Sequence, residues 1–248
     1  MEQFIMQVAG RVVAVSALYT PTRYHCREYI CTGEPEFSVE ITPEDIAFEQ
    51  ITLDRERAIE GLPAQEMHGA QLERTALQRK LAEELFKYDT QLFHGSVIAV
   101  DGQAYLFTAK SGTGKSTHTR LWREMLGQRA VMINDDKPFL RVMEDHVAVC
   151  GSPWNGKHGL GSNACVPLKA ICLLERGEEN KIRKISADEA VFMLLQQSNR
   201  PRQPALLPKY MELLDQIAHK TAFYRLACNM DIAAAELSYR TMSGENLV

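Results

Sequence analysis

The chain has 248 residues, of which 45% are apolar, and its 28 Lys and Arg against 32 Asp and Glu give a formal net charge of −4. These values are ordinary for a globular protein and exclude extended disorder, collagen-like repeats and a mucin-like stalk. A slightly acidic chain also argues against a general nucleic-acid or membrane-surface binder, because both need a basic face.

The N-terminal region, residues 1–62, is predicted to be rich in β-strands. Runs of β-branched or alternating apolar and polar residues predict strands at 11–18, 28–31 and 36–41. The residues Thr-Pro-Glu-Asp at 42–45 indicate a turn or a capped helical turn.

The hydrophobic period changes after this region. Leu77, Leu81, Leu85 and Tyr88 recur every three or four positions, with charged residues between them. This spacing predicts an amphipathic helix over about residues 66–87.

From there on, short strands alternate with helices. Strands are predicted at 96–100, 104–108, 130–133, 139–142, 146–150, 168–174 and 182–185, and helices at 115–126, 187–197, 205–219 and 231–239. Asp101-Gly102 indicates a tight hairpin between the first two of these strands. We therefore expect an α/β fold in a single domain over 1–248, with residues 63–248 as the catalytic core.

Residues 109–116 read Ala-Lys-Ser-Gly-Thr-Gly-Lys-Ser and match the phosphate-binding P-loop pattern, with alanine in place of its first glycine. Gly112 and Gly114 allow positive φ, so successive N–H groups can converge on one phosphate, beside the positive end of the following helix. Lys115 would place a cation on the β- and γ-phosphates, and Ser116 a hydroxyl on Mg²⁺. The predicted nucleotide site comprises Ser111, Gly112, Thr113, Gly114, Lys115, Ser116 and Thr117.

Two adjacent carboxylates follow the next predicted strand. Asp135 and Asp136 come 19 and 20 residues after Ser116, an interval filled by one helix, one turn and one strand. We therefore expect the loop and the carboxylates at the same end of neighbouring strands. Beside a P-loop, one carboxylate can hold Mg²⁺ and the other can accept the proton of an attacking hydroxyl. The alternative is a solvated turn.

These motifs carry a resemblance. Phe93-His94-Gly95, the hairpin, the P-loop and Asn134-Asp135-Asp136 resemble the catalytic domain of the bacterial HPr serine kinase/phosphorylase, which is similar to phosphoenolpyruvate carboxykinases. The resemblance covers about residues 93–175. It implies a mixed sheet around the P-loop, oligomers, and Mg²⁺-dependent transfer of the terminal phosphate of ATP to a hydroxyl, in that family a serine of a small carrier protein.

The resemblance also implies roles for single residues. Asp135 would be the general base, while Asp136 and Ser116 would hold Mg²⁺. Lys115 and His94 would lie at the transferred phosphate.

The chain departs from the family after the two carboxylates. The family's Glu-x-Arg-Gly segment has its nearest counterpart in residues 156–161, which contain no Glu, so the metal shell is either thinner or completed by Asn163. The long Gly-rich loop at 151–163 is nevertheless typical of a functional segment. Within it, Trp154 either stacks on a substrate or packs in the core.

The sequence favours a kinase that phosphorylates a hydroxyl on a protein, peptide or small molecule, with ATP and Mg²⁺ as cofactors. Two other functions remain open: a non-catalytic ATP-binding regulator, and a carboxykinase- or phosphorylase-type phosphoryl transfer. No nucleic acid or membrane partner is expected, whereas a homo-oligomer is possible.

The six cysteines form no C-x-x-C pair and are predicted to be buried free thiols, which fits a cytoplasmic protein. The first residues, Met-Glu-Gln-Phe, do not resemble a signal peptide. No apolar run approaches the ~18–20 residues that a membrane-spanning helix needs.

Overall fold

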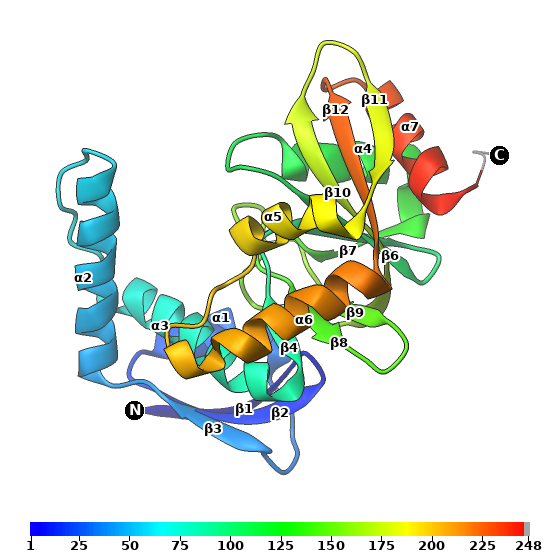
Figure 1. Ribbon diagram of the computed structural model, residues 1–248. Coiled ribbons are helices and arrows are strands. Elements are labelled where there is room, and N and C mark those ends of the chain that lie inside the picture. The colour runs from blue at the N-terminus through cyan, green and yellow to red at the C-terminus, as the bar shows by residue number, and fades with distance from the viewer. Residues whose placement is uncertain (246–248) are drawn as a thin grey trace. The chain divides into compact units, whose positions relative to one another are not determined.

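The computed structural model describes residues 1–245 and divides the chain into two compact units, Met1–Leu85 and Phe86–Val248 (Figure 1). The sequence pattern predicts an earlier boundary, at residue 62, between the β-rich N-terminal region and the catalytic core. The difference arises from helix α3 (Gly69–Leu85), which packs against two other helices of the first unit. Its apolar residues Leu77 and Leu81 are completely buried there.

The first unit combines a three-stranded sheet with helices. The sheet has the order β1 (Glu2–Val8), β2 (Arg11–Ala17), β3 (Phe37–Glu40), with β1 antiparallel and β3 parallel to β2. Helices α1 (Thr20–His25), α2 (Pro43–Ile59) and α3 complete the unit. The predicted strand at 28–31 is wrong, because Arg27–Tyr29 forms a 3₁₀ turn.

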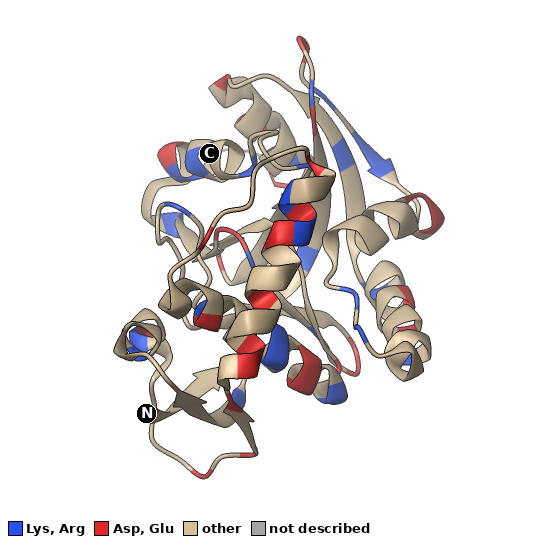
Figure 2. Cartoon of the chain, turned by 90° about the vertical axis from the view of Figure 1, so that its left-hand side faces the viewer, with Lys and Arg blue, Asp and Glu red and all other residues tan. Residues whose placement is uncertain are grey.

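Helix α2 is the largest element that the sequence analysis does not anticipate. Thr42 begins it with a capping box, in which its hydroxyl accepts from the Asp45 N–H and the Asp45 carboxylate accepts from the Thr42 N–H. The expected helical turn therefore continues for 17 residues. Charged residues of both signs line α2 (Figure 2), which obscures the apolar spacing that identifies most helices.

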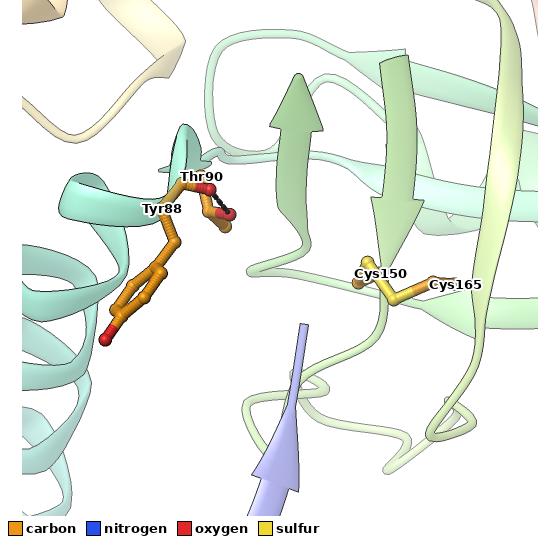
Figure 3. The surroundings of a disulfide bond; sticks show 4 residues. All are labelled: Tyr88, Thr90, Cys150 and Cys165. Carbon is orange, nitrogen blue, oxygen red and sulfur yellow. Dashed lines mark hydrogen bonds between the residues drawn. A yellow bond between two sulfur atoms is a disulfide. The ribbon is translucent and has the colours of Figure 1, made fainter. Parts of the chain in front are cut away.

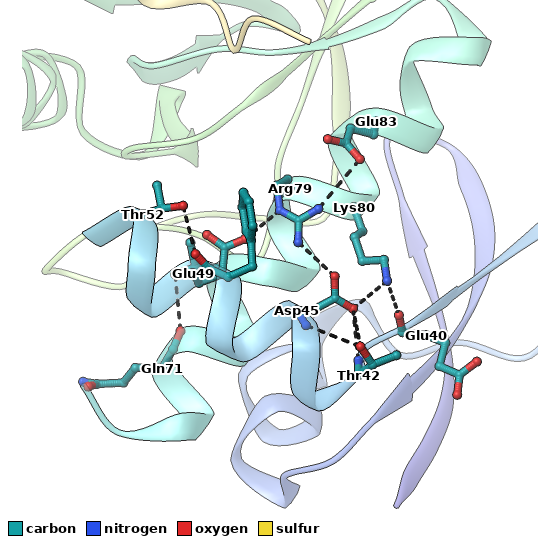
Figure 4. A network of polar contacts seen from close by, with 11 residues as sticks. Glu40, Thr42, Asp45, Glu49, Thr52, Gln71, Arg79, Lys80 and Glu83 are labelled. Carbon is teal, nitrogen blue, oxygen red and sulfur yellow. Dashed lines mark hydrogen bonds and ion pairs between the residues drawn. The ribbon is translucent and has the colours of Figure 1, made fainter. Parts of the chain in front are cut away.

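Ion pairs fasten α2 to α3 (Figure 4). The Arg79 guanidinium lies 2.6 Å from Glu49 Oε1 and 3.0 Å from Asp45 Oδ1, and Lys80 Nζ lies 2.7 Å from Asp45 Oδ2. Burial raises the pKa of Asp45, but hydrogen bonds from Lys80, the Thr42 backbone and Arg79 outweigh it and bring that pKa to about 2. Asp45 therefore stays ionised and paired at neutral pH.

We expect His25 to make the first unit sensitive to acid. Burial, then the charges of Arg74 and Arg27, lowers the pKa of His25 from 6.5 to about 4. Between these values the unfolded chain binds a proton that the folded chain excludes. This contribution is complete above pH 6.5 and is lost as the pH falls through 4, with a slope of up to ~1.4 kcal/mol per pH unit.

Urea unfolding of the wild type and of His25→Gln, followed by circular dichroism between pH 7 and pH 4, measures this slope. The free energy of unfolding should fall less steeply with acid in the variant. Equal slopes would show that His25 does not take up the proton.

In the second unit, nine strands of residues 86–245 form one mixed sheet. The main path has the order β4-β8-β9-β10-β6-β5-β7, while β12 pairs with β10 and β11 with β12. The strands are β4 (Thr90–Leu92), β5 (Ser96–Val100), β6 (Gln103–Thr108), β7 (Ala130–Asn134), β8 (Phe139–Val142), β9 (Val147–Cys150), β10 (Cys165–Arg176), β11 (Lys181–Ile185) and β12 (Ala222–Cys228). The expected α/β fold with a mixed sheet is confirmed, although β4 and β12 were not predicted.

Apolar residues on both faces of this sheet support the helices. Along β5, Val97 and Ala99 belong to a core shared with α5 (Ala187–Gln197) and α6 (Leu207–Lys220), whereas Ile98 and Val100 belong to one shared with α4 (Lys115–Leu126) and α7 (Ile232–Ser243). This alternation follows from the two-residue period of a strand. All four helices match their predicted ranges to within four residues at each end.

Strand direction brings the predicted motifs to one edge of the sheet. β5 is antiparallel to both β6 and β7, so β6 and β7 run in the same direction on either side of it. The end of β6, the end of β7 and the start of β5 therefore meet at one edge. These three positions carry the P-loop, the two carboxylates and the His94-Gly95 segment.

The structure corrects the expectation that all cysteines are free thiols. Cys150 and Cys165 face each other on neighbouring strands β9 and β10 and form a disulfide (Figure 3). Cys26, Cys31, Cys172 and Cys228 are free. Among the described residues, no helix combines the length and apolar character required to cross a membrane.

Candidate functional site

The P-loop joins β6 to α4 and leaves the start of the helix open. Gly112 and Gly114 have φ of +75° and +120°, conformations that side chains rarely adopt. A Cβ at either position would have no described atom within 4 Å, so these glycines serve the backbone turn and not a tight contact. No side chain caps α4. Its first N–H groups are therefore available to an anion.

Lys115, the first residue of α4, bends back over this loop. Its Nζ donates a 3.1 Å hydrogen bond to the Ala109 carbonyl oxygen. Burial lowers the pKa of Lys115, the negative charge of Asp136 opposes this, Lys137 adds to it, and Asp135 opposes it. The charges of both carboxylates therefore act on the Lys115 amine.

Asp135 is buried and fixed by hydroxyl groups. Its exposure is 7%, and its Oδ1 accepts a 2.6 Å hydrogen bond from Ser96 Oγ, which lies 2.8 Å from Thr119 Oγ1. Asp135 and Ser116 line the same pocket of about 260 Å³. The carboxylate and the P-loop hydroxyl can therefore face one ligand.

Asp136 lies in a different environment from its neighbour. Its side chain is 37% exposed, and its Oδ1 lies 3.5 Å from His94 Nε2. Burial, followed by the charges of Lys137 and Lys115, lowers the pKa of His94 to about 4, against a hydrogen bond with Gln197 that raises it. At neutral pH, His94 is consequently an uncharged partner of Asp136.

Asn134, which the sequence analysis used only as part of a motif, organises the whole turn. Its Nδ2 donates to the carbonyl and hydroxyl oxygens of Ser152 at 3.1 Å and to Asn155 Oδ1 at 2.7 Å. Its Oδ1 accepts from the N–H groups of Asp136 at 2.9 Å and Lys137 at 2.7 Å. This completely buried amide thus joins the backbone of Asp136 and Lys137 to the Gly-rich loop.

We expect Asn134→Ala to destabilise the protein by about 2 to 4 kcal/mol, because it leaves several buried polar groups without partners. The same change should loosen the backbone at Asp136. Urea unfolding measures the first effect. Asn155→Ala, which removes only one of these hydrogen bonds, is the matched control and should cost clearly less; equal losses would contradict a central role for Asn134.

The Gly-rich loop reaches the carboxylates from the other side. Gly156 has φ of +58°, and a Cβ there would lie 3.1 Å from the Asp135 carbonyl oxygen. Trp154 is only half-buried, so it is not a core residue. Lys157, His158 and Asn163 are exposed.

A second pocket, of about 500 Å³, lies on the other side of the P-loop. Its lining includes Gly112, Thr117, Leu174, Arg176 and Met230. An Arg176 guanidinium nitrogen donates a 2.7 Å hydrogen bond to the Gly112 carbonyl oxygen. No sequence motif marks Arg176 as a site residue, because Arg176 and Gly112 lie 64 residues apart in the chain.

His118 lies one turn into α4 and also lines this second pocket. It is buried against Phe107, with Nε2 2.9 Å from Ser238 Oγ.

The residues around the P-loop fit a magnesium ion. Mg²⁺ prefers oxygen ligands and keeps several waters, so one hydroxyl and one carboxylate beside a phosphate suffice. Ser116 and Asp135 provide these two oxygens in one pocket. The described residues contain no group of three or more His, Cys, Asp or Glu that could hold a metal without a phosphate.

Comparisons with known proteins give a family for the chain. The profile of SynChlorMet cassette protein ScmC matches residues 70–236, which are 167 of the 248. No curated protein matches. Among solved structures, the HPr(Ser) kinase/phosphatase from Coxiella burnetii is similar, with 15% identity and a TM-score of 0.31 over 49% of this chain and 93% of that chain. On the extent of the profile match, this chain belongs to the SynChlorMet cassette protein ScmC family.

Proposed function

We propose that this protein is a Mg²⁺-dependent phosphotransferase that moves the terminal phosphate of ATP to a hydroxyl group. One observation carries the proposal. The open N-terminus of α4, the Lys115 amine and two carboxylates of different exposure meet at one edge of the sheet. This is the set of groups that phosphoryl transfer requires.

The P-loop would hold the phosphates. Its N–H groups and the helix N-terminus attract the negative charge, and Lys115 adds an ammonium group that follows the charge as it moves onto the leaving oxygen. The larger pocket beside Thr117 is of a size to take the rest of the nucleotide. Bound Mg²⁺ would neutralise charge on the phosphate oxygens.

The geometry favours exchanging the two aspartate roles that the resemblance implies. Asp135 is buried, is held by Ser96 and lines the pocket of Ser116, which suits a metal partner. Asp136 is more exposed and lies beside a neutral His94, which suits a group that must reach the acceptor hydroxyl. In this assignment Asp136 takes the hydroxyl proton and His94 positions its carboxylate.

Transfer of labelled phosphate from ATP tests the proposed function. The purified chain should turn over ATP, slowly to water and faster to a suitable hydroxyl acceptor, and only with Mg²⁺ present. Binding of ATP without any turnover across a broad set of acceptors would instead identify a nucleotide-binding regulator. Absence of both binding and turnover would refute the nucleotide site.

A further inference from the structure

We propose that the acceptor is an extended acidic peptide that lies along the free edge of β7 and places a carboxylate on Arg123. The inference rests on the proposed function, since it names the substrate class of the same site. It draws on the smaller pocket, whose lining includes Ser116 and Asp135 and also Arg120, Arg123 and Met132 of β7.

The pocket offers an unused positive charge. Arg123 is half-buried, and none of the described residues pairs with its guanidinium group. Arg120 also lines the pocket, but its guanidinium group forms an ion pair with Glu124 on the same helix. His158, from the Gly-rich loop, lines the pocket as well. The Arg123 guanidinium can therefore pair with an anionic ligand, and a carboxylate matches its planar donors.

An open strand edge favours a peptide over a small molecule. β7 ends the main path of the sheet and pairs only with β5 among the described strands. On its other side, the Ser162 N–H reaches the Ile133 carbonyl and Asn134 forms a bridge with Gly161. The preceding residues remain free, and Val131 is 51% exposed. Such an edge can add an extended peptide through main-chain hydrogen bonds.

Helix geometry sets the spacing within that peptide. Arg123 follows Ser116 by seven residues, which places it about 10 Å farther along α4. An extended chain covers this distance in about three residues. The acidic residue should therefore lie about three positions from the hydroxyl that accepts phosphate.

Blocked alanine-rich peptides with a single serine test the proposal on the purified chain with Mg²⁺ and ATP. One pair carries Glu three residues after or three residues before the serine, and matched peptides carry Gln or Lys at those positions. Glycerate serves as a small hydroxy acid. For one of the two spacings, kcat/KM for the Glu peptide should exceed that for its Gln match at least tenfold, mainly through KM.

Charge reversal separates recognition from folding. Arg123→Glu should prefer the Lys peptide to the Glu peptide, and Arg123→Gln should lose the preference. Arg240→Glu, an exposed arginine on α7, should keep the wild-type preference. Three outcomes would overturn the acceptor proposal: equal use of the Glu and Gln peptides, a preference that survives in both Arg123 variants, or transfer to glycerate alone. In each of these cases, continued ATP turnover would still support the proposed function. Loss of ATP turnover in the wild type itself would reject both.

Discussion

Replacing Lys115 by alanine is expected to lower ATP turnover about a thousandfold, the upper range for removing one preorganised donor to a developing anion. The amine is held inside the loop by the Ala109 carbonyl and is electrostatically coupled to Asp136 and Asp135. In the proposed function it would follow the charge of the transferred phosphate. The turnover number at saturating ATP and Mg²⁺ is the quantity to compare.

The variant should stay folded, because the side chain forms one hydrogen bond to a loop carbonyl and is not part of either apolar core. Its thermal midpoint should remain within a few degrees of the wild type. Lys184→Ala, which removes an exposed ammonium group from β11 of the same unit, is the matched control and should keep full turnover. Wild-type turnover in Lys115→Ala would place the nucleotide elsewhere.

The P-loop and the carboxylates were predictable because their chemistry is local in sequence. Gly112 and Gly114 specify the turn within a few residues, and Asp135 follows after one helix and one strand. The prediction that they lie at the same end of the sheet is confirmed, but the prediction that their strands are neighbours is wrong, because β5 separates β6 from β7. β5 lies between the two strands and runs antiparallel to both, which returns His94 to the same edge.

Features that depend on distant partners were not predictable. Asn134 is a central hydrogen-bonding residue only because the Gly-rich loop folds back over it, and Arg176 meets Gly112 across 64 residues of chain. Helix α2 was missed since its contacts with α3 are ion pairs with Arg79 and Lys80 and not an apolar stripe. The pairing of Cys150 with Cys165 follows from the register of β9 with β10, which composition does not reveal.

Asp136→Asn is expected to reduce phosphate transfer by about 10² to 10⁴, the usual contribution of a general base, while ATP binding is retained. Asp135→Asn should act differently. Because the Asp135 carboxylate shares a pocket with Ser116, its loss should raise the Mg²⁺ concentration needed for half-maximal turnover at least tenfold. Two adjacent and chemically identical residues would thus give separable defects.

Turnover measured across a MgCl₂ titration at saturating ATP distinguishes the two effects, with Asp188→Asn, an exposed aspartate at the start of α5, as the control. If Asp136 is the base, its variant has a low maximum and a normal midpoint, whereas the Asp135 variant recovers part of its turnover at high Mg²⁺. The opposite pattern would return the base to Asp135, as the resemblance implies. In that case Asp135 would accept the proton on Oδ2, since its Oδ1 already accepts a 2.6 Å hydrogen bond from Ser96 Oγ.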